Sequence, residues 1–465
     1  MTRINFSEKE IQEHIWKYKD DFYEIIGEFE LPPLYQFNHN EQSIEELTSD
    51  KILFNIIIER IRNIFEDLQS LRLFGNEVSL GNIGETKIRA DFLGKAEGIP
   101  GIYIVELKKD GQTERQAFTE LLAYANQINA KFPSHSRDDN VFILICPMYG
   151  KTIEDAFLQS LVFDKRKICI LHPIFEDENE ITSLKLKPHI PSLEDIIHFS
   201  SNAFKKRNFD VLVYSWNNEE THWNPKPEGQ NIVDMNRVAG LAAQLMEEKG
   251  IHGFVYPQQQ WPEFNNLLPN TNKLVLVGLN PYKIASDNYF RINNPELEHL
   301  EPPSLFEIND EINLTNILPG LGKHNDIHTD WNYFTDLGYN WVSNLHHIGQ
   351  KAVEACTINR MGVKIHSEGV FGGSFDQYES SNIESVYVFQ YDLRPTGVIR
   401  ELYWEVTRHD YTHWSKYGSH PFYGDAFGWA IENTESYLLF ETFLRIMFYG
   451  RDNEADIDDE DIQED

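Results

Sequence analysis

The short apolar segment VFILICP at 141–147 constrains the fold of this chain more than any other feature. A continuous apolar run of this length is typical of a strand that is buried on both faces of a sheet. A helical pattern precedes it at 113–131, a second follows at 153–163, and another apolar strand follows at 167–173. This alternation of helices with buried strands predicts an α/β sandwich with a mixed central sheet.

The segments before this run extend the same domain. In residues 52–68 apolar side chains recur every three or four positions, which predicts a buried helix. The helices expected here span 8–26 and 43–72, and the strands expected after them span 86–94 and 101–109.

The expected N-terminal domain runs from residue 1 to 200. Its last part, 176–200, combines the acidic run EDENE with prolines and is typical of a linker.

Residues 201–450 predict a second, β-rich region of α+β type, and residues 451–465 predict an acidic disordered tail. Fourteen residues of that tail, 452–465, carry nine acids and no base. The elements expected in the second region are strands at 209–216 and 273–281, a helix at 232–250, a loop-rich stretch at 281–345, a hairpin of 385–393 with 397–407, and a helix at 432–450.

Charge limits what the chain can bind by itself. Lys and Arg number 41 and Asp and Glu number 74, so the net charge is −33, the opposite of a protein that coats nucleic acid alone. No apolar run approaches the roughly 20 residues that cross a bilayer, and the N-terminus lacks the apolar stretch of a secretory signal. Three cysteines in 465 residues argue against a disulfide framework. These features predict a cytoplasmic protein.

The residues most suggestive of chemistry are Asp91, Glu106 and Lys108. Side chains alternate along a strand, so Glu106 and Lys108 face the same way and Leu107 faces the core. Pairing of the two predicted strands brings Asp91 and Glu106 to one end of the sheet. Two carboxylates suit Mg²⁺ or Mn²⁺, and a lysine beside them can orient and polarise an attacking water. Phosphodiester hydrolysis requires these parts.

This arrangement resembles the PD-(D/E)XK nuclease superfamily, which has the restriction-endonuclease-like fold. The matching residues are Asp91 and the triplet Glu106-Leu107-Lys108, followed directly by a helix. The resemblance implies metal ligation by Asp91 and Glu106, catalytic roles for those two residues and Lys108, and a further site role for Gln116, where several members place a glutamine. It covers roughly residues 50–175.

Several assignments stay open at this stage. The superfamily often adds an acid from its first helix, and the candidates are Glu59, Glu66 and Glu85. Gln116, Glu120 and Tyr124 lie at four-residue steps on one helix face, but a polar stripe is more often a solvated face. The triplet itself also occurs on ordinary strands with solvated charges.

The whole layout resembles the nuclease–APAZ subunits that accompany short prokaryotic Argonautes, in SPARDA-type (DREN-APAZ) systems. The strand–helix–strand segment at 210–258, the β-rich remainder and the acidic tail carry this second resemblance. It implies a short Argonaute partner made of MID and PIWI domains, which loads a guide RNA and captures single-stranded target DNA. The resemblance further implies that target recognition activates the nuclease through higher-order assembly, and that the degradation of DNA and RNA stops phage or plasmid spread by abortive infection.

Two other functions remain as alternatives. The first is a stand-alone restriction-type endonuclease whose residues 205–450 read DNA sequence, and the second is a non-catalytic scaffold. His409, His413 and His420 have spacing that could bind a metal, but packed or surface histidines are the simpler interpretation.

Overall fold

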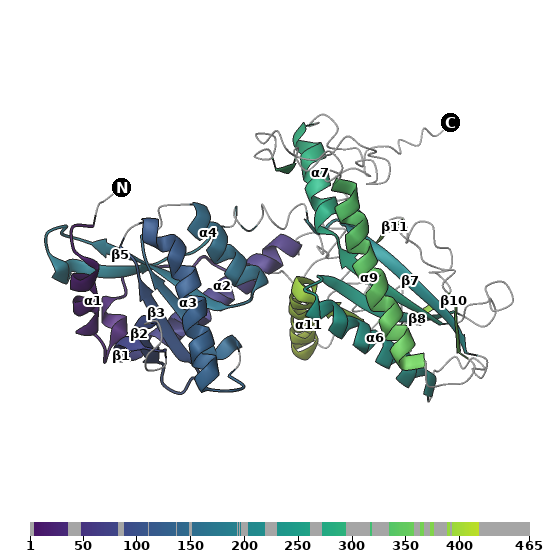
Figure 1. Cartoon of the computed structure of the whole chain (residues 1–465), viewed down its shortest axis with the longest axis horizontal. Coiled ribbons are helices and arrows are strands. Elements are labelled where there is room, and N and C mark those ends of the chain that lie inside the picture. Colours follow the sequence, from purple (N-terminus) through teal and green to yellow (C-terminus); the bar gives the residue numbers. More distant parts are fainter. Residues whose placement is uncertain are drawn as a thin grey trace. The chain divides into compact units, whose positions relative to one another are not determined.

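The computed structural model divides the chain into two compact units (Figure 1). One unit comprises Met1–Tyr35 and Phe54–Asp195, and the other comprises Gln36–Leu53 and Ile196–Asp465. The residues that the structure describes are 4–35, 48–81, 88–109, 111–135, 137–147, 151–192, 194, 196, 203–218, 230–260, 272–293, 317–318, 334–357, 363–366, 373–375, 388–390 and 393–417.

The first unit is built on a mixed sheet of six described strands in sequence order. The parallel pairs are β3 with β4 and β4 with β5, and the other neighbours run antiparallel. The strands are β1 (Arg72–Ser79), β2 (Arg89–Lys95), β3 (Ile102–Leu107), β4 (Asn140–Ile145), β5 (Lys167–Phe175) and β6 (Leu184–Pro188). The structure thus confirms the predicted mixed α/β architecture.

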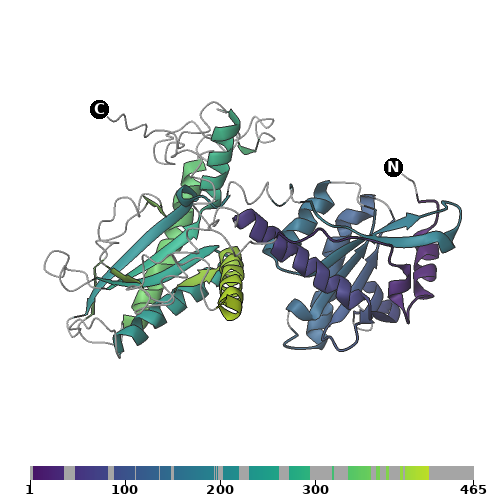
Figure 2. The same ribbon diagram turned by 180° about the vertical axis from the view of Figure 1, so that it is seen from behind.

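Helices cover both faces of this sheet. Figure 1 shows α3 and α4 in front of the strands, and Figure 2, from behind, shows α2 on the opposite face. The helices are α1 (Glu8–Trp16), α2 (Ser49–Leu68), α3 (Gly111–Lys131) and α4 (Lys151–Leu158), with short turns at Phe22–Ile25, Gln159–Phe163 and Ile181–Ser183. The stripe predicted for α2 is confirmed, because Ile57, Ile58 and Ile61 have no exposed surface.

Two strands of this sheet were not predicted. Strand β1 falls where a helix was expected to end, and it contains an irregularity between Leu73 and Gly75 that interrupts regular alternation. Strand β6 falls within the expected linker, 176–200, and that part of the prediction is wrong. Its alternation of buried Leu184 and Leu186 with Lys185 and Lys187 is that of a half-buried strand.

The second unit contains an antiparallel sheet with helices packed on it. The order of the path is β10-β7-β9-β8-β12, with β11 beside β7 and β13 beside β8. The strands are β7 (Phe209–Asn218), β8 (Gly253–Gln260), β9 (Asn272–Leu279), β10 (Val363–His366), β11 (Gly373–Ser374), β12 (Val388–Gln390) and β13 (Arg394–Thr396). The helices are α6 (Gln230–Glu248), α7 (Pro281–Asn293), α9 (Phe334–Thr357) and α11 (Gly397–Tyr417).

One apolar core joins this sheet to α6 and α9, which lie side by side in front of the strands in Figure 1. Its fully buried members include Leu212 of β7, Ala242 of α6, Leu276 of β9 and Ala352 of α9. The antiparallel sheet and its helices fit the predicted α+β class.

Two predictions for this unit are wrong. Residues 397–407 form the start of α11 and not the second strand of a hairpin. The stretch 281–345 contains α7 and the first half of α9 and is not only loop. The predicted helix at 432–450 and the acidic tail at 451–465 lie outside the described residues.

Candidate active site

The site residue Asp91 lies in β2, beside the end of β3. Strands β2 and β3 pair antiparallel with Phe92 opposite Val105, so the same register places Asp91 opposite Glu106. The side chain of Asp91 also crosses to β3, where its Oδ2 accepts a hydrogen bond of 2.8 Å from the backbone N–H of Leu107. The pairing of these two strands therefore brings the two predicted carboxylates together.

Glu106 is the most deeply buried charged residue of the site. Its exposed fraction is 2%, and its Oε1 pairs with the ammonium group of Lys108. Its other oxygen, Oε2, is buried without a hydrogen-bond partner among the described residues. Burial, followed by the charge of Asp91, raises the pKa of Glu106 to about 8. A buried carboxylate with an unsatisfied oxygen is costly unless a cation or a proton neutralises it.

Lys108 follows β3 directly, and its backbone is fixed while its side chain reaches two acids. Its N–H donates to the carbonyl of Ile145 at 2.8 Å, which ties it to β4. Its side chain is 11% exposed and forms ion pairs with Glu106 and, at 2.8 Å, with Oε2 of Glu120. Burial opposes its charge, but the hydrogen bonds to Glu106 and Glu120 raise the pKa of Lys108 overall. Lys108 therefore stays charged in this site.

Helix α3 supplies two further side chains to the site. Glu120 reaches Lys108, and Tyr124, one turn later, is 5% exposed. Burial and the charges of Glu106, Glu120 and Asp91 raise the pKa of Tyr124. This face of α3 is therefore part of the site, and the interpretation of the stripe as simply solvated does not hold for Glu120 and Tyr124. Gln116 lies in α3, but its side chain is outside the described residues.

An acid from α1 acts on Asp91 and was not predicted. Burial is the main cause that raises the pKa of Asp91 to about 6, and the charge of Glu8 adds to it. Of the three candidates named from the sequence, Glu66 is exposed on α2, Glu59 is partly buried there, and Glu85 lies outside the described residues. The signal that could have drawn attention to Glu8 is its place in the first turn of the first helix.

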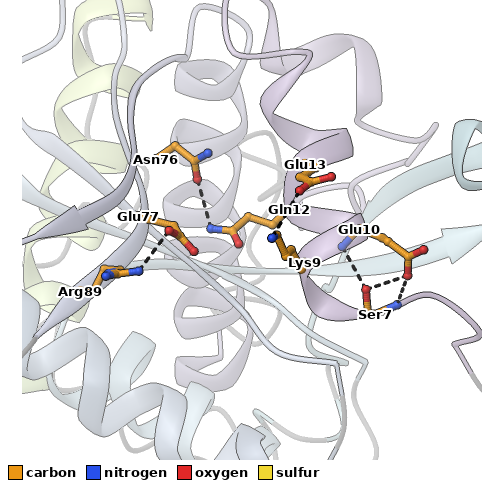
Figure 3. Close-up of polar contacts among 8 residues, drawn as sticks. All are labelled: Ser7, Lys9, Glu10, Gln12, Glu13, Asn76, Glu77 and Arg89. Atoms are coloured by element: carbon orange, nitrogen blue, oxygen red, sulfur yellow. Dashed lines mark hydrogen bonds and ion pairs between the residues drawn. The ribbon is translucent and has the colours of Figure 1, made fainter.

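The first turn of α1 is held in place by local hydrogen bonds (Figure 3). Ser7 and Glu10 form a capping box, in which the Glu10 N–H donates to Ser7 Oγ and the Ser7 N–H donates to the Glu10 carboxylate. One turn further, the amide of Gln12 donates to Oδ1 of Asn76 in β1 at 3.1 Å. The capping box stabilises the first turn, which contains Glu8, and the Gln12–Asn76 hydrogen bond ties α1 to the edge strand β1.

The donors present suit a hard divalent cation. Among the described residues, no group of three or more His, Cys, Asp or Glu side chains is arranged to hold a metal ion. However, Mg²⁺ is commonly held by one or two carboxylates, with waters and substrate phosphates as its other ligands. Asp91 and Glu106 provide that number, and Oε2 of Glu106 is buried without a hydrogen bond among the described residues.

The described cysteines and several histidines outside this site are buried or in contact with neighbouring groups. Cys146 and Cys169 are buried and unbridged, which is typical of core cysteines. His346 stacks on Tyr214, and His347 bonds to the carbonyl of Ser343. His409 lies on α11, whereas the side chain of His413 and all of His420 lie outside the described residues, so the structure leaves that cluster untested.

Comparison of the chain with protein-family models, with curated proteins and with solved structures gave no match. Among the described residues, no helix is both long enough and apolar enough to cross a lipid bilayer.

Proposed function

We propose that this protein is a metal-dependent nuclease of the PD-(D/E)XK type. The observation that carries the proposal is the convergence of Asp91, Glu106 and Lys108 where the paired strands β2 and β3 meet, with one carboxylate oxygen of Glu106 buried and without a hydrogen bond among the described residues. The mixed sheet, with α3 following β3 directly, supports the same assignment. A buried lysine beside two acids of raised pKa is also a common property of catalytic sites.

The roles of the side chains follow from their positions. Asp91 and Glu106 would hold Mg²⁺ or Mn²⁺, and the bound ion supplies charge stabilisation and an activated water. Lys108 stays protonated, so it cannot act as a general base. It orients the water and balances negative charge as the phosphate is attacked. The Leu107 N–H keeps Asp91 in its orientation.

The charge of the chain suggests how such a nuclease is controlled. Residues 85–131 carry seven acids and seven bases, within a chain of net charge −33. A molecule this acidic repels free nucleic acid at long range. We therefore assign the capture of guide RNA and target DNA to a short Argonaute partner bound by the second unit, as in nuclease–APAZ systems. The nuclease then degrades DNA and RNA only after target recognition, as a cytoplasmic antiviral effector.

The test is a cleavage assay with the full chain, plasmid DNA and RNA in Mg²⁺ or Mn²⁺, with and without the guide-loaded partner and its target DNA. We expect cleavage only with the complete complex. Glu106→Gln and Lys108→Met each lower the rate about a hundredfold or more. The matched controls Glu176→Gln and Lys187→Met change exposed side chains and keep full activity.

The other outcomes contradict the proposal in distinct ways. Sequence-specific fragments from the chain alone indicate a restriction-type enzyme. Cleavage that survives both site variants shows that the hydrolysis does not belong to this site, and absence of cleavage with every partner indicates a scaffold.

A further inference from the structure

The ammonium group of Lys108 lies between carboxylates from two different elements. Glu106 is part of β3, and Glu120 projects from α3 with its Oε2 at 2.8 Å from Lys108 Nζ. The backbone of Lys108 is tied to β4, so a change of partner has to come from its side chain. The two acids also differ in burial, because Glu106 is 2% exposed and Glu120 is 36% exposed.

A lysine on Glu106 and a divalent cation on Glu106 compete for one carboxylate. Both are positive, and two cations close together in a buried site repel strongly. Lys108 is therefore the internal counter-ion of Glu106 whenever that carboxyl is ionised in the metal-free chain. When a cation binds to Glu106, the ammonium group of Lys108 needs another anion nearby, because an unpaired buried charge has a large desolvation cost. Glu120 is the anion that is already in contact with it.

We propose that Glu120 is a positioning residue that holds Lys108 when a divalent cation occupies Asp91 and Glu106. This inference rests on the proposed nuclease function and extends it to the way in which the site accepts its metal. Cation binding exchanges the Lys108–Glu106 ion pair for the Lys108–Glu120 ion pair. Glu120 thus both lowers the competition for Glu106 and keeps the lysine next to the reacting phosphate.

The surroundings of Glu120 support this role over that of a surface acid. Tyr124 is buried one helical turn away, which anchors this face of α3 against the sheet. Glu120 is also more exposed than Glu106, with 36% of its side chain accessible against 2%, so water solvates its charge better. A charged acid therefore faces the lysine throughout the exchange.

The test measures Mn²⁺ binding to the full-length protein by electron paramagnetic resonance, which detects free Mn²⁺ without any need for activity. We expect Lys108→Met to bind Mn²⁺ about fivefold more tightly than the wild type, because the competitor is gone, and Glu120→Gln to bind it about fivefold more weakly. Glu120→Asp keeps the charge and recovers part of the loss. Glu176→Gln, which removes an exposed charge elsewhere, leaves binding unchanged.

The double variant Lys108→Met with Glu120→Gln is the decisive sample. If Glu120 acts through the lysine, the double variant binds Mn²⁺ as tightly as the Lys108→Met variant does, since no competing lysine remains. If Glu120→Gln weakens binding equally with and without the lysine, Glu120 is a metal ligand and the inference is wrong. The inference is also wrong if Glu120→Gln alone leaves binding unchanged.

The same measurement separates this inference from the function on which it rests. Wild-type protein that binds no Mn²⁺ at a site sensitive to Glu106→Gln contradicts the metal-dependent nuclease itself. Binding that Glu106→Gln abolishes but Glu120→Gln does not affect contradicts only the role of Glu120. In the activated nuclease, we expect Glu120→Gln to raise the Mn²⁺ concentration for half-maximal rate and to lower kcat, with KM for DNA unchanged.

Discussion

Glu106 stores unfavourable electrostatic energy in the folded protein. Its carboxyl is buried beside Asp91, and these two causes raise its pKa to about 8 from an ordinary value of 4.5. Between about pH 4.5 and pH 8, the folded state therefore holds a proton on Glu106 that the unfolded state has released. Stability therefore falls as the pH rises from about 4.5 to about 8. Such a penalty is common where a residue is retained for function and not for stability.

Glu106→Gln should remove this penalty. We expect the metal-free variant to be more stable than the wild type by about 1–2 kcal/mol above pH 8 and to lose most of the slope between about pH 6 and 8. The slope that remains at lower pH belongs to Asp91, whose pKa is raised by burial to about 6. Urea unfolding in the presence of a chelator at several pH values measures both effects. An unchanged slope, with Glu176→Gln as control, contradicts the buried ionisation of Glu106.

The core of the site was predictable from local spacing, and its surroundings were not. Alternation along a strand placed Glu106 and Lys108 on one face, and strand pairing placed Asp91 near them. Four-residue spacing singled out Glu120 as part of one helix face, but it could not show the contact with Lys108. That contact and the approach of Glu8 depend on helices that the fold brings to the strand ends, and no local pattern encodes such a distance. Their assignment needs the packing of α1 and α3 on the sheet.

At the level of elements, the errors have physical causes. Residues 397–407 contain β-branched and aromatic side chains that suggested a strand, yet the buried positions are Val398, Ile399, Leu402 and Val406. Their spacing is that of one helix face. Helix α7 was missed because Pro281 suggested a stop. Proline is also favoured at the first position of a helix, and here the Asn280 side chain caps it by accepting hydrogen bonds from the next two N–H groups.

The capping box of α1 gives a prediction about one element. Ser7→Ala removes the hydrogen bond to the Glu10 N–H and should lower the free energy of unfolding of the first unit by about 1 kcal/mol. Ser7→Asp supplies another capping oxygen and should keep most of that stability. Urea denaturation followed by circular dichroism measures the difference. Equal stability of the Ser7→Ala variant and the wild type contradicts the view that this cap fastens α1.

For the molecule as a whole, a net charge of −33 repels nucleic acid, so we expect a partner to capture the substrate that this chain cleaves. We expect the purified chain alone to bind single-stranded DNA weakly, with a dissociation constant above about 10 μM at physiological salt. The complex with a short Argonaute and guide RNA should bind complementary DNA much more tightly. Fluorescence anisotropy with labelled DNA measures both. Tight, salt-resistant binding by the chain alone contradicts this division of labour and favours the restriction-type alternative.

The central claim is that Asp91 and Glu106 hold a catalytic divalent cation beside Lys108. Crystals of the full-length protein grown with Mn²⁺, with data collected near the manganese absorption edge, test it most directly. The account predicts an anomalous peak within coordination distance of both carboxylates, with Lys108 turned toward Glu120, and no such peak in Glu106→Gln crystals. Wild-type crystals with no peak at these carboxylates, or with a peak that persists in Glu106→Gln, contradict it.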